Sequence, residues 1–293
     1  LHSLRRRQRQ MCIRDSYWNH AAPRIQGWGE ELKSRINANP PTTDYDFWPI
    51  IKKDMPTVSH EIGQWCVYPD FKEIQKYTGV LKAKNFEIFQ ETLAEKHLSD
   101  LADEFLYASG RLQTLCYKAD IEAALRTPGF AGFQLLDLHD FPGQGTALVG
   151  VLNPFWESKG YVEGEEYSMF CNQTVPLARL PKMVYLNNES MKAPLEFAHF
   201  GAEPLKSASI YWKLADKKGT ILQSGSWTKD LPVTNSIWIG NMICDLSSVK
   251  TPQELILTAG IEGTKVHNEW HIWVYPAEEK KITNAPYMTN VFD

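Results

Sequence analysis

Several features that would define a protein class at once are missing from this sequence. Its 5 cysteines form no C-x-x-C pair and no cluster with His at the spacing of a zinc site, which argues against a disulfide scaffold or a zinc module. No apolar run reaches the roughly 18 to 20 residues that a membrane-spanning helix needs. The net charge of −4 gives no general attraction to nucleic acid or anionic lipid. We therefore expect no metal site, no cofactor, no nucleic-acid partner and no membrane span.

The composition that is present is that of a globular protein. The chain has 293 residues, of which 43% are hydrophobic and 23% charged, so it can bury a sizeable core in one large domain or two smaller ones. Aromatic residues make up 12%, including 10 Trp. Large cores use Trp, and so do surfaces that stack on sugar rings.

Positive charge gathers in residues 1–16, where five Arg and one Asp give +4 and leave −8 for the rest of the chain. One interpretation is a basic arm that binds nucleic acid. The other is a segment foreign to the fold, because residues 8–16 resemble translated sequencing-adapter sequence and the chain starts with Leu. We favour the second interpretation. We expect residues 1–16 to be a non-native leader, and the chain to be a metagenomic gene fragment truncated at both ends.

Residues 17–181 have the pattern of alternating helices and strands. Short apolar runs at 57–62 and 133–138 predict two buried strands, and the periodic segment 99–126 between them predicts one long helix or two, with Gly110 as a soft point. A strand, a helical segment and a second strand are typical of a parallel α/β sheet. Further helices are expected at 29–39, 71–77, after a cap at Asn85, and at 165–180.

Residues 183–276 have the pattern of a β-domain. About seven short strands in this length, separated by turn signals, are the count of an immunoglobulin-like sandwich. The remaining residues, 277–293, are expected to be a linker or the start of a further segment. Candidate strands span 183–187, 195–200, 208–214, 221–227, 237–245, 254–262 and 269–275.

Polar side chains follow both strands of the first region. Glu61 ends the first strand, next to His60, and Asp137, His139 and Asp140 follow the second. The carboxyl ends of neighbouring parallel strands meet at one edge, where the sites of (β/α)₈ barrels lie, so we expect these groups to converge. Gln64 and Trp65 follow Glu61 closely enough to border the same place.

Each of these residues also has a structural interpretation. Glu61 is able to cap a loop or pair with an Arg, His60 to serve as a hydrogen-bond partner, and Asp137 and Asp140 to cap turns. A metal site at His60, Asp137 and His139 is disfavoured, because their spacing matches no firm ligand pattern.

Two segments carry a resemblance to a known family. Residues 56–69 (PTVSHEIGQWCVYP) and 127–150 (TPGFAGFQLLDLHDFPGQGTALVG) resemble the last part of the catalytic barrel of bacterial enzymes related to glycoside hydrolase family 2, such as β-galactosidases. Residues 268–276 resemble the end of a sandwich domain that follows this barrel. The family's Trp in the eighth strand is replaced by Leu135 or Leu136, and the helical insert between the two strands departs from the common pattern.

The resemblance implies a fold and a function. It implies the last strands and helices of a (β/α)₈ TIM barrel at 17–181, followed by the sandwich at 183–276. It implies a retaining exo-β-glycosidase that acts on oligosaccharides or polysaccharides, in the periplasm of a bacterium or secreted from it. Glu61 matches the nucleophile; the residues expected to bind the sugar are His60, Gln64, Trp65, Asp137, His139 and Asp140.

The second carboxyl group of such an enzyme has no match in the sequence. The family places its acid/base Glu after an Asn, far upstream of the nucleophile, and no Asn-Glu pair precedes Glu61. We therefore expect the chain as given to be inactive. The alternative is a non-catalytic carbohydrate-binding or interaction module, with a stacking face on the sandwich. Its candidate residues are Trp212, Trp227, Trp238, Trp270 and Trp273, although we favour packing of these side chains in the core or between domains.

Overall fold

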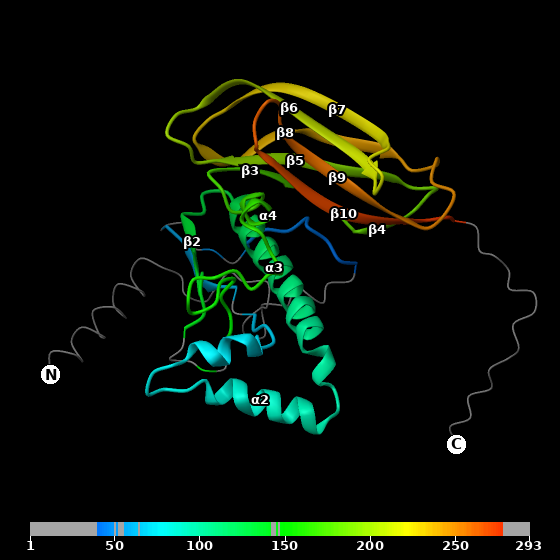
Figure 1. The fold of residues 1–293 in the computed structure, drawn as a ribbon. Coiled ribbons are helices and arrows are strands. Elements are labelled where there is room, and N and C mark those ends of the chain that lie inside the picture. Colours follow the sequence, from blue (N-terminus) through cyan, green and yellow to red (C-terminus); the bar gives the residue numbers. More distant parts are fainter. Residues whose placement is uncertain are drawn as a thin grey trace, which may run out of the picture.

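The computed structural model of the chain describes residues 40–49, 51, 56–63, 65–141, 145 and 147–277. It has an α/β part and a β-sandwich, and the long helix α3 (Ala102–Arg126) runs beneath the sandwich (Figure 1). The proposed leader 1–16, the helix expected at 29–39 and most of the tail lie outside the described residues.

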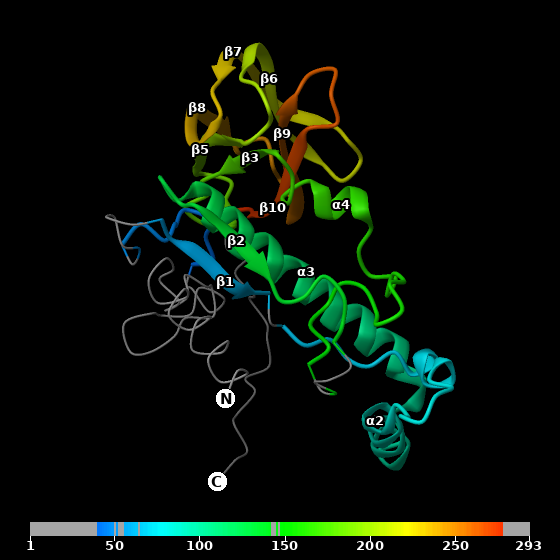
Figure 2. The same cartoon turned by 90° about the vertical axis from the view of Figure 1, so that its left-hand side faces the viewer.

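The α/β part contains the strand–helix–strand unit that the sequence predicts. Strands β1 (Val58–Ile62) and β2 (Gly132–Leu135) pair in parallel, with Val58 opposite Gly132, and α3 lies alongside both (Figure 2). The other elements are the 3₁₀ helices η1 (Phe71–Lys76) and η2 (Ser99–Leu101) and the α-helices α2 (Lys84–Glu95) and α4 (Gly164–Ser168). The described residues hold two strands of this sheet, so the assignment of this part to the end of a (β/α)₈ barrel stays a prediction.

Two local expectations about helices are wrong. Asn85 does not cap α2, which begins one residue earlier after Ala83; its side-chain amide instead donates to the carbonyl of Gly145. Gly110 is no soft point, because α3 is continuous over 25 residues. A Cβ at Gly110 would lie 2.2 Å from the ring of Tyr161, so this glycine makes room for a packed aromatic.

The helix expected at 165–180 is also wrong beyond its first turn. After α4 the chain turns and forms strand β3 (Thr174–Ala178), all five residues of which are buried. Pro176 has no N–H for a helix interior. The strand pairs with β5 in the sandwich, so the change of structure comes before the boundary expected near Pro181.

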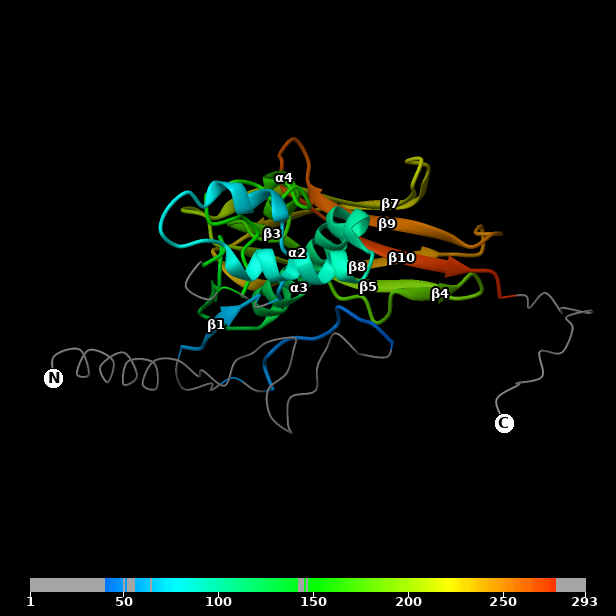
Figure 3. The same ribbon diagram turned by 60° about the horizontal axis from the view of Figure 1, so that its bottom comes forward.

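The β-sandwich itself is confirmed, with all seven expected strands present and β3 as an addition. One sheet has the order β4-β10-β9-β6-β7 and the other β3-β5-β8. The layers lie behind α3 in the view of Figure 3 and enclose a core that includes Trp212, Leu214, Trp270 and Ile272. The strand bounds are β4 (Val184–Leu186), β5 (Ser190–His199), β6 (Leu205–Asp216), β7 (Ile221–Leu231), β8 (Thr234–Asp245), β9 (Gln253–Ile261) and β10 (His267–Tyr275).

A buried charge network joins α3 to the sandwich. The carboxylate of Glu122 lies 2.6 Å from Lys118 Nζ and 3.1 Å from Arg126 Nη1, both one turn away on the same helix. It also accepts hydrogen bonds from Asn268 Nδ2 (2.8 Å) and Trp270 Nε1 (3.1 Å) of β10. Burial acts to raise the pKa of Glu122, but the neighbouring cations and hydrogen bonds outweigh it and hold this pKa below its usual range.

A second buried cluster fastens the loop after β2. Asp140 lies 2.6 Å from Lys159 Nζ and accepts a hydrogen bond of 2.8 Å from the backbone N–H of Gly150. Glu73 of η1 is 2% exposed nearby. Its burial raises its pKa to about 7, although the charge of Lys159 opposes the shift. The cluster therefore holds an acid that ionises near neutral pH inside the fold.

The Glu122 network predicts a large loss of stability on neutralisation. The substitution Glu122→Gln leaves the buried Arg126 and the partly buried Lys118 without their common counter-charge, and breaking a buried pair typically costs about 3 to 5 kcal/mol. We expect a decrease of this order in the free energy of unfolding, measured by urea denaturation. Glu91→Gln on α2 removes a charge at an exposed position and serves as the control, with an unchanged midpoint. Equal midpoints for both variants would contradict a joining role for Glu122.

The Glu73 cluster predicts a pH-dependent gain from Glu73→Gln. The acid ionises at pH 4.5 in the unfolded chain and at about 7 in the folded one, so ionisation costs the parent stability as the pH rises through this window. The stability of Glu73→Gln relative to the parent should therefore increase by about 3 kcal/mol between pH 4.5 and 7 and stay level above it. Urea unfolding at successive pH values measures this difference. A difference that does not vary with pH would refute the shifted ionisation.

Candidate functional site

The first candidate site lies where β1 and β2 end, and it contains Glu61, Asp137 and His139; we call it the strand-end site. Glu61 is half-buried and adopts a φ of 56°, in the left-handed region that non-glycine residues rarely occupy. Gly63 follows with a φ of 80°, and a Cβ there would lie 1.8 Å from the ring of Tyr117. Close packing against Tyr117 of α3 therefore determines the backbone path two residues after Glu61.

Asp137 is brought into electrostatic contact with Glu61. Partial burial raises the pKa of Asp137; His139 lowers it and the Glu61 charge raises it further. The backbone carbonyl of Asp137 accepts a hydrogen bond of 2.9 Å from the hydroxyl of Tyr117 on α3. The same helix thus supports both strand ends, and the structure gathers three of the seven site residues that the sequence predicts.

The other four predicted residues have different surroundings. Asp140 is buried in its pair with Lys159, so it has the turn-fastening role that the sequence left open. Trp65 is half-buried, and its indole N–H has no hydrogen-bond partner among the described residues. The backbone carbonyl of Trp65 accepts a hydrogen bond of 2.7 Å from the side-chain amide of Gln113 on α3. Gln64 and the side chain of His60 lie outside the described residues.

One aromatic residue beside this site was not singled out from the sequence. The ring of Trp156 lies 4.4 Å from that of His139, centroid to centroid, and the residue has a φ of 65°. The turn signal Asn153-Pro154 marks the loop in the sequence but does not show which ring faces outward.

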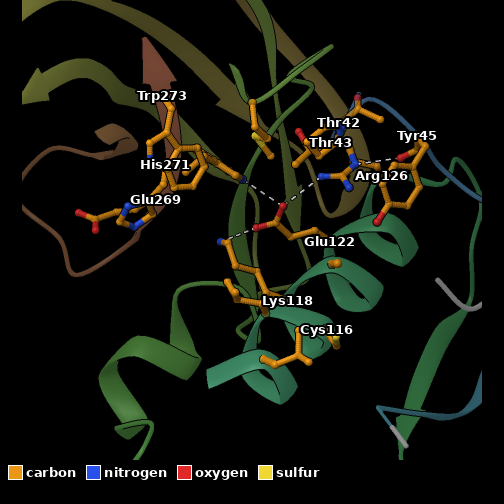
Figure 4. A pocket seen from close by; sticks show the side chains of 16 residues that line it. Thr42, Thr43, Tyr45, Cys116, Lys118, Glu122, Arg126, Glu269, His271 and Trp273 are labelled. Atoms are coloured by element: carbon orange, nitrogen blue, oxygen red, sulfur yellow. Dashed lines mark hydrogen bonds and ion pairs between the residues drawn. The ribbon is translucent and has the colours of Figure 1, made fainter. Parts of the chain in front are cut away.

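A second candidate site is a cavity of about 350 Å³ between α3 and β10. Its apolar walls include Leu112, Leu115 and Trp273, which are all exposed. Lys118, Glu122 and Arg126 line it from α3, as Figure 4 shows, with their charges paired through Glu122. The acid that α3 contributes to this lining is therefore already engaged by two cations.

The tryptophan face that the alternative of a carbohydrate-binding module requires is not formed by these residues of the sandwich. Trp212 and Trp270 are buried in the core, and Trp227 packs partly against it. Trp273 is 39% exposed on β10, and Trp238 is 56% exposed on β8 of the other sheet. Trp270 and Trp273 point to opposite sides, as their odd spacing predicts.

The part of the chain that the structure describes offers neither a cluster of metal ligands nor a membrane-spanning helix. No group of three or more His, Cys, Asp or Glu in this part of the chain is arranged to hold a metal ion. No helix among the same residues is long and apolar enough to cross a membrane.

Comparison with protein families and curated proteins gives one match. Residues 189–276 match the family described as a domain of unknown function, DUF8488, which covers most of the sandwich. The chain matches no curated protein.

Three of the solved structures with similar parts are a CARDB domain and two glycoside-cleaving enzymes. One is a CARDB domain of the PF1109 protein from Pyrococcus furiosus, with 11% identity and a TM-score of 0.27 over 35% of this chain and 93% of that one. Another is a β-glucuronidase from Parabacteroides merdae, with 13% identity and a TM-score of 0.27 over 35% of this chain and 14% of that one. The third is the exo-chitosanase CsxA of Amycolatopsis orientalis, with 12% identity and a TM-score of 0.36 over 58% of this chain. The chain spans only 19% of the chitosanase, so it corresponds to a small part of both enzymes.

Proposed function

We propose that this chain is part of a retaining exo-β-glycosidase in which Glu61 is the nucleophile. The observation that carries the proposal is the position of Glu61 and Asp137 at the carboxyl ends of two adjacent parallel strands, close enough to interact electrostatically. In barrel enzymes this end of the sheet holds the catalytic groups. The resemblance of both strand segments to family 2 glycoside hydrolases supports the same assignment.

The reaction proceeds by double displacement. A carboxylate oxygen of Glu61 attacks the anomeric carbon while the bond to the leaving oxygen breaks and a second carboxyl group protonates that oxygen. Water, deprotonated by the second group, then releases the sugar from Glu61. Asp137 and His139 stand beside the nucleophile, where they hydrogen-bond sugar hydroxyls. The two carboxyl groups of a retaining enzyme lie about 5 to 5.5 Å apart, and we assign the acid/base to a residue upstream of this chain.

A non-catalytic interaction module is the second candidate function. It is favoured by the cavity between α3 and β10, whose apolar wall residues Leu112, Leu115 and Trp273 are exposed. In this case a partner would bind at the junction of the two parts, and Glu61 would have no catalytic role.

The complete gene, read through both ends of this segment, supplies the test. We expect an upstream Asn-Glu pair at the end of a strand, and hydrolysis of an aryl β-glycoside by the full-length protein. In that protein, Glu61→Gln should reduce kcat by a factor on the order of a thousand or more, because it removes the nucleophile. Glu91→Gln, remote on α2, should leave kcat unchanged. Full activity of Glu61→Gln would exclude Glu61 as the nucleophile.

The 293-residue chain by itself should show no turnover of aryl β-glycosides, because the proposal assigns the acid/base group to a residue upstream of it. Chromogenic release of nitrophenol measures this. Turnover by the purified chain would contradict an upstream acid/base. It would transfer that role to Asp137, whose raised pKa and proximity to Glu61 suit a proton donor.

A further inference from the structure

Trp156 combines two unusual properties. Its side chain is 62% exposed, although Trp is among the largest apolar side chains, and its backbone φ is 65°. A bulky residue in the left-handed region is a conformational outlier, and such outliers gather at ligand sites, where the surrounding structure maintains the strain. The position of this ring therefore calls for a functional reason.

A tight turn holds Trp156 in this conformation. The buried side chain of Asn153 accepts hydrogen bonds from the backbone N–H groups of Phe155 (2.9 Å) and Glu157 (3.0 Å). The N–H of Trp156 donates to the carbonyl of Asn153 at 3.0 Å. The ring of Phe155 packs against Tyr77, with centroids 5.2 Å apart. Phe155 thus anchors the turn, and the neighbouring Trp156 is directed outward.

Trp156 is also linked to the strand-end site. Its ring lies against that of His139, at 4.4 Å and an interplanar angle of 44°. His139 is itself fixed by a hydrogen bond of 2.8 Å between Nδ1 and the carbonyl of Asp140, and its charge acts on Asp137. An aromatic surface therefore begins beside the carboxylates and extends outward through His139 to Trp156.

We propose that Trp156 is the stacking platform for a sugar ring of the substrate. The inference rests on the proposed glycosidase function and adds a binding residue to it. A β-linked pyranose presents a face of C–H groups, and the negative face of an indole ring attracts such groups while shielding apolar surface from water. The class of ligand is a β-pyranoside, bound with one sugar on Trp156 and its glycosidic bond toward Glu61.

Trp238 provides the matched comparison within the same chain. It is similarly exposed, at 56%, but lies on β8 of the sandwich, and the ammonium of Lys229 lies 5.0 Å from its ring centroid. One face of its indole is thus covered by a cation. Trp238 is therefore the control: a ligand of the strand-end site should affect Trp156 alone, whereas non-specific contact with exposed indole rings should affect both residues.

Titration of the 293-residue chain with methyl β-D-galactopyranoside, methyl β-D-glucopyranoside and methyl β-D-glucuronide tests the proposal. The indole N–H signals are followed by ¹⁵N nuclear magnetic resonance, and Trp156→Phe identifies the signal of Trp156. We expect at least one probe to shift this signal and not that of Trp238. Trp156→Ala should weaken binding of that probe about tenfold, Trp156→Tyr should weaken it less, and Trp238→Ala should not change it.

Several results would overturn the proposal. They are equal affinity of Trp156→Ala and the parent, a shift at Trp238 alone, and no shift at Trp156 with any of the three probes. Sugar binding and hydrolysis, measured separately in the Glu61→Gln and Trp156→Ala variants, distinguish failure of this inference from failure of the proposed function. Binding that depends on Trp156, with no hydrolysis by the complete protein, would refute the glycosidase and keep the platform. Hydrolysis that needs Glu61 but has the same KM in Trp156→Ala would refute the platform and keep the glycosidase.

Discussion

The contact on which the rest of the structure depends is the buried carboxylate of Glu122. It is bound by two cations of its own helix and by two donors of β10, so a single acid joins the α/β part to the sandwich. Removing one ion from such a group leaves the others buried without compensation, which makes the network far more costly to break than a surface pair. Helix α3 is consequently held in place from the sandwich side.

That fixed helix determines the geometry at the strand ends. Tyr117, one turn before Ile121 on the buried face of α3, bonds the carbonyl of Asp137 and fills the space beside Gly63. The Lys159–Asp140 pair and the turn at Asn153 then fix the loop after β2. Glu61 and Trp156, to which we assign attack and stacking, are two of the five non-glycine residues with a positive φ among the described residues; the others are His97, Ser207 and Ser236. The fold tolerates these conformations because the Tyr117 ring packs beside Gly63 and because the Asn153 side chain holds the turn around Trp156.

Whether an element could be predicted from the sequence depends on whether nearby or distant residues determine it. Strands β1 and β2, the helix between them and the seven later strands were predictable, because each depends on the spacing of apolar residues along the chain. Strand β3 was not predictable as a strand. The acidic run before it has helical character, while its own five residues are buried by β5, β10 and α3, which all lie outside this segment of the chain. The cap at Asn85 failed for a similar reason, since a remote carbonyl at Gly145 competes for its side chain.

For the site, the sequence by itself determined that Glu61 and Asp137 end neighbouring strands and that Trp270 and Trp273 cannot both face the core. Those conclusions need only the periodicity of strands and the direction of parallel pairing. Tertiary structure decided that Asp140 fastens a loop, that Glu122 joins the two parts, and that Trp156 stands beside His139. These roles depend on burial and on partners up to 148 residues away, as for Glu122 and Trp270. A buried charge or an exposed ring is defined by what surrounds it in space, and no local pattern encodes those surroundings.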